Sequence, residues 1–123
     1  MTAQDGLYEL IVQNPEGNEY EVISSISATH SGSDVATFVG YLADPAVVIV
    51  SSTITEAGYL PGAEGGIDLT NAAVQADIAA LKGGEATAVT TAPGKFVAGL
   101  LARRAADAGS ITFLPCDNVP DNG

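Results

Sequence analysis

Two polar segments, each directly after a short apolar run, carry the residue types best able to do chemistry. The first apolar run, Val47 to Val50, leads into Thr53-Ile54-Thr55-Glu56-Ala57-Gly58-Tyr59. The second, Ile111 to Leu114, leads into Cys116-Asp117-Asn118-Val119-Pro120-Asp121-Asn122-Gly123. An open α/β sheet presents its chemistry where buried strands end in polar loops at the carboxyl edge. These two segments are therefore the candidate site.

Asn118 has the clearest chemical potential in these segments. Its side-chain amide is able to donate a hydrogen bond to a substrate carbonyl while negative charge builds on that oxygen. An Asx-turn, in which the side chain satisfies the neighbouring backbone, accounts for an asparagine at this place equally well. The spacing of the residues leaves both interpretations open.

The other polar side chains of the two segments have more modest expected roles. Glu56 follows a strand, where it is able to relay protons or hold a ribose, although a solvated loop carboxylate is the simpler interpretation. Asp117 is expected to brace its loop rather than to act as an acid. Cys116 is expected to be a small buried residue rather than a nucleophile, because no base lies near it in the sequence.

Most common catalytic signatures are absent from the sequence. No Gly-x-Gly-x-x-Gly follows a strand, and Gly94-Lys95 lacks the upstream glycine and the following Ser or Thr of a phosphate loop. With one histidine and one cysteine, a zinc site would need carboxylates as ligands, so no metal site is predicted. His30 lies in a polar Thr-His-Ser-Gly turn and is expected to be a solvated loop residue.

Composition narrows the class of protein. The 123 residues are enough for one domain with a modest core, and fifteen acidic against four basic residues give a net charge of −11. This charge repels phosphate backbones and anionic membranes, so neither nucleic acid nor a membrane is an expected partner. The single cysteine, the lack of signal-peptide features at the N-terminus and the lack of a long apolar stretch predict a soluble, cytoplasmic chain.

The hydrophobic periodicity predicts the elements that position the two segments. Strand patterns at residues 7–13 and 20–26 predict a hairpin with a loop of about five residues. Helices are expected from the N-cap at Asp34 to about Leu42, from Asn71 to Leu81, and from Pro93 to about Ala108. The third helix should bury a stripe of four apolar residues, which are Phe96, Val97, Leu100 and Leu101.

The order of these elements predicts an α/β fold in which the runs at 47–51 and 111–114 form parallel strands. A right-handed crossover through the helices would join them, and their continuous apolar character is typical of strands covered on both faces. The glycine-rich stretch from Gly58 to Gly66 is expected to be a loop. Parallel pairing would bring both polar segments to the same carboxyl edge.

Four ordered blocks of the sequence also resemble the long-chain polyol-specific dehydrogenases, the mannitol dehydrogenase and fructuronate reductase family. The blocks are Gln4-Asp5-Gly6-Leu7-Tyr8, Val22-Ile23-x-Ser25-Ile26-Ser27, Ile49-Val50-Ser51-x-Thr53-Ile54-Thr55-Glu56-x-Gly58-Tyr59 and Cys116-Asp117-Asn118-x-Pro120-x-Asn122-Gly123. The resemblance covers essentially the whole chain. It implies a partial Rossmann-like parallel sheet with flanking helices and an N-terminal β-hairpin.

The resemblance implies an NAD-dependent interconversion of a polyol, mannitol-like or a sugar acid, and its ketose or keto-acid. The family's pattern assigns Asn118 to the reacting oxygen, as a catalytic residue. It implies that four residues border and bind the cofactor, which are Ser51, Thr53, Thr55 and Glu56. The implied partners are a polyol or ketose substrate, the rest of the enzyme, and possible further copies of the chain.

Some features of the family are missing or altered. Ser52 stands where leucine is usual, and Pro115 precedes the cysteine where a serine is frequent. The glycine-rich turn that grips the pyrophosphate and the general-base lysine of the helical C-terminal domain are not in this sequence. Residues 1–123 are thus expected to be an interior segment of the nucleotide-binding domain, inactive alone. The alternative is a small acidic α/β interaction module without catalysis.

Overall fold

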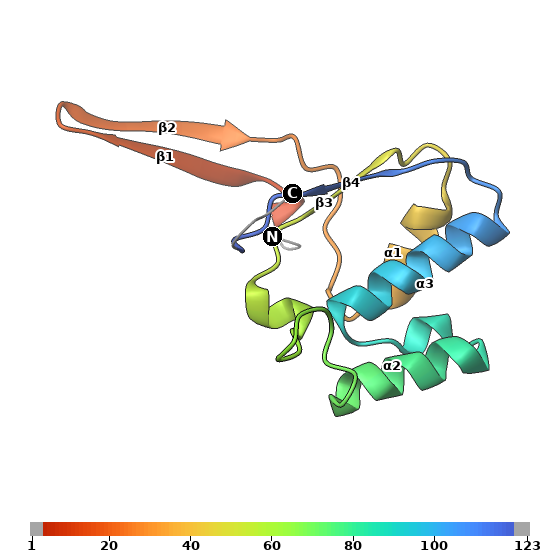
Figure 1. Cartoon of the computed structure of the whole chain (residues 1–123). Helices are drawn as coiled ribbons and strands as arrows, with labels where there is room; N and C mark the ends of the chain where they lie inside the picture. The colour runs from red at the N-terminus through yellow and green to blue at the C-terminus, as the bar shows by residue number, and fades with distance from the viewer. Residues whose placement is uncertain (1–3, 120–123) are drawn as a thin grey trace. The chain divides into compact units, whose positions relative to one another are not determined.

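The computed structural model describes residues 4–119, which divide into two compact units at Gly32 (Figure 1). The first unit is a β-hairpin of β1 (Tyr8–Asn14) and β2 (Gly17–Ile23), which pair antiparallel from Tyr8↔Ile23 to Asn14↔Gly17. The hairpin is the one predicted, but its loop is the two residues Pro15 and Glu16 rather than five. Pro15 has the φ value that the first central position of a tight turn requires, which allows the strands to pair closer to the turn.

The second unit is an α/β arrangement, as predicted. Its elements are α1 (Val35–Ala43), β3 (Ile49–Ser52), the short 3₁₀ helix η2 (Glu56–Tyr59), α2 (Ala72–Gly83), the 3₁₀ helix η3 (Ala86–Ala88), α3 (Ala92–Ala105) and β4 (Thr112–Pro115). Strands β3 and β4 pair in parallel, with Ile49 opposite Thr112 and Ser52 opposite Pro115. The predicted parallel pairing through a helical crossover is confirmed.

Side-chain caps start the three α-helices where the sequence predicted. Asp34 Oδ1 accepts a hydrogen bond from the Thr37 N–H at 3.1 Å, and Asn71 Oδ1 accepts one from the Ala73 N–H at 2.9 Å. Thr91 Oγ1 does the same for the Gly94 N–H at 3.0 Å, with Pro93 in the first turn of α3. These contacts satisfy backbone donors that the first turn of a helix leaves free. Helix α3 ends at Ala105, earlier than the predicted Ala108.

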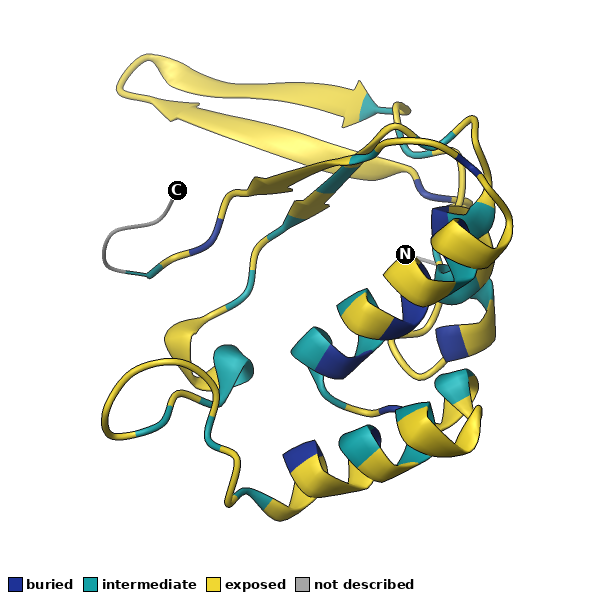
Figure 2. Ribbon diagram, turned by 45° about the vertical axis from the view of Figure 1, so that its right-hand side comes forward, coloured by how far each residue is buried: buried dark blue, intermediate teal, exposed yellow. Residues whose placement is uncertain are grey.

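The core of the second unit lies between its helices rather than on the sheet (Figure 2). Val35, Val89 and Ala98 form the buried cluster, and Leu42 of α1 packs against Gly99 of α3. The predicted apolar stripe of α3 is therefore wrong for three of its four residues, since Val97, Leu100 and Leu101 are exposed. The buried face of α3 consists of Gly94, Ala98, Gly99 and Arg103 instead. Gly99 leaves room for Leu42 of α1, and Gly94 leaves room for Asp77 of α2.

The parallel strands are not covered as predicted. Ile49 is 58% exposed and Leu114 is 51% exposed, and β4 is exposed along its whole length. Parallel strands normally have helices or further strands over both faces. Their apolar pattern is typical of strands that are covered on both faces. Within residues 4–119, however, β3 and β4 pair only with each other, in a two-stranded sheet.

Candidate functional site

The two polar segments meet at the carboxyl edge of the β3–β4 pair. The Cys116 N–H donates to the Ser52 carbonyl at 2.8 Å, which extends the ladder beyond the strands. Three residues further along, Thr55 and Asn118 form a parallel bridge that keeps the register of the strands. The structure therefore places the Thr53–Tyr59 segment directly beside the Cys116–Asn118 segment, as the predicted parallel pairing requires.

The predicted site residues lie on or next to this edge. Asn118 and Thr55 are exposed neighbours in the bridge, and Glu56 is exposed as the first residue of η2. Ser51 is an exposed residue of β3, and Thr53 is exposed directly after that strand. The assigned roles of these five residues stay predictions, but their side chains share one edge and are accessible.

Asp117 is the buried centre of the site, with only 8% of its surface exposed. Its Oδ1 accepts a hydrogen bond from the Ile54 N–H at 2.6 Å, and its Oδ2 accepts one from Ser52 Oγ at 3.1 Å. The Tyr59 hydroxyl also donates to Oδ2. Asp117 thus braces its loop, as expected from the sequence, but it also ties the neighbouring segment to that loop.

These contacts shift the pKa values of Asp117 and Tyr59. Burial pushes the pKa of Asp117 up, but the hydrogen bonds from Tyr59, Ile54 and Ser52 outweigh burial and bring that pKa below its ordinary value. The hydrogen bond to Asp117 raises the pKa of Tyr59, and burial adds to the shift. At neutral pH the pair is therefore a carboxylate that accepts from a neutral phenol.

The segment that Asp117 holds is tightly folded. A Cβ placed on Gly58 would lie 2.6 Å from Ile54 Cγ2, closer than side-chain carbons approach one another. Leu60, which follows η2, has the left-handed values φ 53° and ψ 57°. A residue with a side chain is uncommon in this region, so the backbone here is held by its surroundings.

The sequence does not reveal the contributions of Ser52 and Tyr59, and the prediction for Cys116 is wrong. Tyr59 lies within one of the two polar segments without a signal for a role, and Ser52 differs from the leucine that is usual at its position. Their hydroxyls meet at one carboxylate only because the segment turns back on itself, and spacing does not reveal that turn. Cys116 is exposed rather than buried, since it lies beyond β4 on an uncovered edge.

Within residues 4–119, the single histidine and the acidic residues do not form a metal site. His30 is exposed and lies outside regular secondary structure, as expected for a loop residue. Residues 4–119 contain no group of three histidine, cysteine, aspartate or glutamate side chains able to hold a metal ion. The same part of the chain contains no helix with the length and apolar character needed to cross a membrane.

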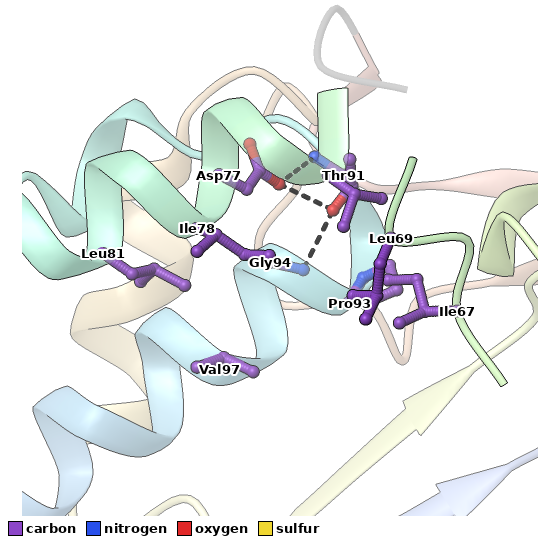
Figure 3. Close-up of a pocket in the computed structure, with 10 residues that line it drawn as sticks. Ile67, Leu69, Asp77, Ile78, Leu81, Thr91, Pro93, Gly94 and Val97 are labelled. Carbon is purple, nitrogen blue, oxygen red and sulfur yellow. Dashed lines mark hydrogen bonds between the residues drawn. The ribbon is translucent and has the colours of Figure 1, made fainter. Parts of the chain in front are cut away.

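A separate apolar cavity of about 130 Å³ lies between α2 and the start of α3 (Figure 3). Its one charged lining residue, Asp77, accepts hydrogen bonds from the N–H groups of Thr90 and Thr91 at 2.8 and 2.9 Å, and from the Thr91 hydroxyl at 2.6 Å. These contacts organise the first turn of α3. None of the predicted site residues lines this cavity, so it is not part of the candidate site.

Comparison with known proteins shows what the chain is similar to. No protein-family model matches the sequence. Over its whole length, the chain is 38% identical to the D-arabinitol 4-dehydrogenase of Ralstonia nicotianae and 34% identical to the mannitol 2-dehydrogenase of Cereibacter sphaeroides. In three dimensions, 96% of the chain superimposes on the Pseudomonas fluorescens mannitol 2-dehydrogenase, solved as a ternary complex with NAD and D-mannitol, with a TM-score of 0.79 and 33% identity.

The predicted resemblance to the polyol dehydrogenases is confirmed. It covers the whole sequence, and the fold agrees with it as well. The chain spans about a quarter of the length of these relatives: 25% of each of the two dehydrogenases and 24% of the solved chain. The α/β fold with a parallel pair and an N-terminal hairpin is the corresponding part of a Rossmann-type fold.

Proposed function

We propose that this chain is part of the nucleotide-binding domain of an NAD-dependent dehydrogenase that interconverts a polyol and its ketose or keto-acid. The observation that carries the proposal is the similarity of the whole chain to polyol dehydrogenases of the same fold. The exposed apolar residues of β3 and β4 support it, because they suit strands that lie inside a larger sheet.

The carboxyl edge suits a dinucleotide. Ligands of open α/β sheets bind outside the carboxyl ends of the strands, and this edge presents the exposed hydroxyls of Ser51, Thr53 and Thr55. Hydroxyls donate and accept hydrogen bonds, and the Glu56 carboxylate accepts them, so these side chains fit ribose and amide groups. When bound, NAD would supply the acceptor for the hydride that leaves the alcohol carbon.

Asn118 would act on the substrate oxygen. It is exposed beside Thr55, so its amide is available to a ligand bound at this edge. A donor aimed at that oxygen stabilises the negative charge that develops on it during hydride transfer. The remaining parts of the reaction, above all the base that takes the hydroxyl proton, would come from outside residues 1–123.

A chimera tests the proposal. This chain would replace the matching segment of the mannitol 2-dehydrogenase of Cereibacter sphaeroides, and the folded product should oxidise mannitol with NAD. The chain by itself should neither bind NADH tightly in a calorimetric titration nor reduce fructose or fructuronate. A folded but inactive chimera would favour the interaction module, and turnover by the isolated chain would contradict the partial domain.

A further inference from the structure

We propose that Asp117 is a positioning residue, whose carboxylate takes the place of a strand carbonyl and thereby holds Asn118 against the Thr53–Tyr59 segment. The inference concerns how the candidate site is assembled. Its consequence for turnover rests on the proposed function, whereas its consequence for loop order does not.

In the hydrogen-bond ladder between β3 and β4, the Asp117 carboxylate accepts at a place where a backbone carbonyl would normally accept. The Thr112 N–H donates to the Val48 carbonyl, and four residues later the Cys116 N–H donates to the Ser52 carbonyl. A regular parallel ladder would next direct the Ile54 N–H to the Cys116 carbonyl. The Ile54 N–H donates instead to Asp117 Oδ1 at 2.6 Å. The side chain therefore continues the ladder beyond the point where the two strands end.

The same carboxylate holds the far end of the segment. Its Oδ2 accepts from Ser52 Oγ at the end of β3 and from the Tyr59 hydroxyl at the end of η2. One buried group thus accepts hydrogen bonds from the first, the third and the last residue of an eight-residue stretch, Ser52–Tyr59. Hydrogen bonds to an ionised acceptor are roughly twice as strong as those between neutral groups, which suits this role.

Asn118 follows Asp117 directly, so whatever fixes Asp117 also fixes Asn118. The bridge to Thr55 keeps the strand register on the far side of Asp117. Asn118 is exposed. The position of its amide therefore depends on the backbone that Asp117 anchors, and Asp117 acts through Asn118 without having to touch a ligand.

The first test measures loop order in the 123-residue chain. Asp117→Ala should increase hydrogen exchange of the Ile54 amide about tenfold more than that of the strand amide of Thr112, as expected for the loss of a single hydrogen bond. The order parameter of the backbone N–H of Asn118 should fall from about 0.85 toward 0.6. Asp117→Asn retains an oxygen acceptor and should restore much of the Ile54 protection.

Asp68→Ala is the matched control for this test. Asp68 also accepts hydrogen bonds from a backbone N–H and a hydroxyl, both of Thr70, at 2.8 and 2.7 Å. Its removal should leave Ile54 and Asn118 unchanged. If Asp117→Ala lowers only the melting temperature, with exchange at Ile54 and order at Asn118 like those of the control, the inference is overturned.

The second test measures turnover in the chimera with the Cereibacter sphaeroides enzyme. Asp117→Ala should lower kcat, measured at saturating NAD, by roughly 10- to 100-fold, because a displaced donor costs catalysis. In an Asn118→Ala background the same change should lower kcat by less than about threefold. Multiplicative effects of the two changes would overturn a role through Asn118.

The two tests separate this inference from the proposed function. A folded chimera that is inactive with the unsubstituted chain contradicts the proposed function, and the exchange measurements still decide whether Asp117 holds Asn118. The same measurements decide it if the chimera does not fold. An active chimera in which Asp117→Ala has normal kcat contradicts the positioning role alone.

Discussion

The two ends of the β3–β4 pair each hold a buried charged side chain, and the two differ in what they hold together. At the amino end, Arg103 is 3% exposed, and its guanidinium donates to backbone carbonyls, which include those of Leu42, Val47 and Ser110. At the carboxyl end, Asp117 accepts from one N–H and two hydroxyls. Arg103 joins the ends of helices and strands, whereas Asp117 joins two segments that carry exposed polar side chains.

The difference follows from the chemistry of each end. In a parallel pair joined by helices, the amino ends of the strands follow the carboxyl ends of helices, where unpaired carbonyls and the negative end of the helix dipole favour a cation. Arginine offers five donors in a fixed fork and does not lose its proton, so it forms a permanent junction. An aspartate titrates and accepts from hydroxyls that are able to rotate. We expect the amino end to determine stability and the carboxyl end to determine function.

The largest expected effect tests the amino end. Arg103→Met should lower the free energy of unfolding by about 3 kcal/mol or more, because several carbonyls would lose their donor and each unsatisfied buried group costs about 1–3 kcal/mol. Urea denaturation of the chain measures this loss. Arg104→Met, one residue along on the exposed side of α3, should change the stability by less than about 0.5 kcal/mol. Equal effects of the two changes would show that the buried junction does not stabilise the fold.

The next prediction concerns Asn118 at the carboxyl end. In the chimera, Asn118→Ala should reduce turnover about 10²- to 10³-fold, or ~3–4 kcal/mol of transition-state stabilisation, because a donor to the developing oxyanion is removed. Its melting temperature should hardly change, since the side chain is exposed. Turnover and melting temperature measured on one preparation check both statements. A change in turnover per folded molecule below about threefold would make Asn118 a turn residue only.

A third prediction tests how the helices support the amino end. A Cβ added at Gly99 would lie 2.3 Å from Leu42 Cδ2, and Leu42 also provides a carbonyl to Arg103. Gly99→Ala should therefore destabilise the fold by about 1–3 kcal/mol through overpacking. Gly40 is a matched control, because it lies inside α1 with open space around it. Gly40→Ala should stabilise by about 0.5–1 kcal/mol, and a stabilising Gly99→Ala would contradict the close contact of the helices.

The elements and their pairing were predictable from the sequence, but the buried polar contacts were not. N-cap residues such as Asp34 and Asn71 indicate the start of a helix from local sequence, and the two apolar runs indicate the strands. The sequence alone places Arg103 in the last turn of α3, where a cation favours the helix dipole, and indicates nothing more. The carbonyls of Leu42, Asp44 and Val47, which accept from its guanidinium, lie about sixty residues away, so no local pattern encodes these contacts. Asp117 was expected to brace its own loop, but its partners between Ser52 and Tyr59 are equally distant in sequence.

The buried face of α3 shows a second limit of the sequence pattern. Four large apolar residues at helical spacing predicted the face, yet Gly94, Ala98 and Gly99 occupy it. Periodicity identifies an apolar stripe but not the surface against which the stripe packs. In this structure Leu42 of α1 lies against Gly99 and Asp77 of α2 lies against Gly94, so these two positions require glycine. The larger side chains Val97, Leu100 and Leu101 stay exposed.

The smallest expected effect uses pH to separate the two ends of the sheet. The folded pKa of Asp117 lies below its ordinary value, so the unfolded chain binds more protons in acid than the folded chain does. The stability that Asp117 provides is therefore complete above the ordinary aspartate pKa of about 3.9 and is lost as the pH falls from there through the folded pKa. Arginine side chains do not titrate in acid. Acid should thus loosen the carboxyl end before the amino end.

Hydrogen exchange at two amides measures this difference. From pH 5 to below about 4, the protection factor of the Ile54 amide, which donates to Asp117, should fall relative to that of Thr112, which donates to the Val48 carbonyl near the amino end. Asp77 also has a lowered pKa, but its contacts are at the start of α3, so its titration should affect Thr90 and Thr91 instead. Asp117→Asn should abolish the acid sensitivity of Ile54 because the titrating group is gone. If Ile54 and Thr112 lose protection together in the unsubstituted chain, the two ends of the sheet open as one unit, and Asp117 does not govern the carboxyl edge separately.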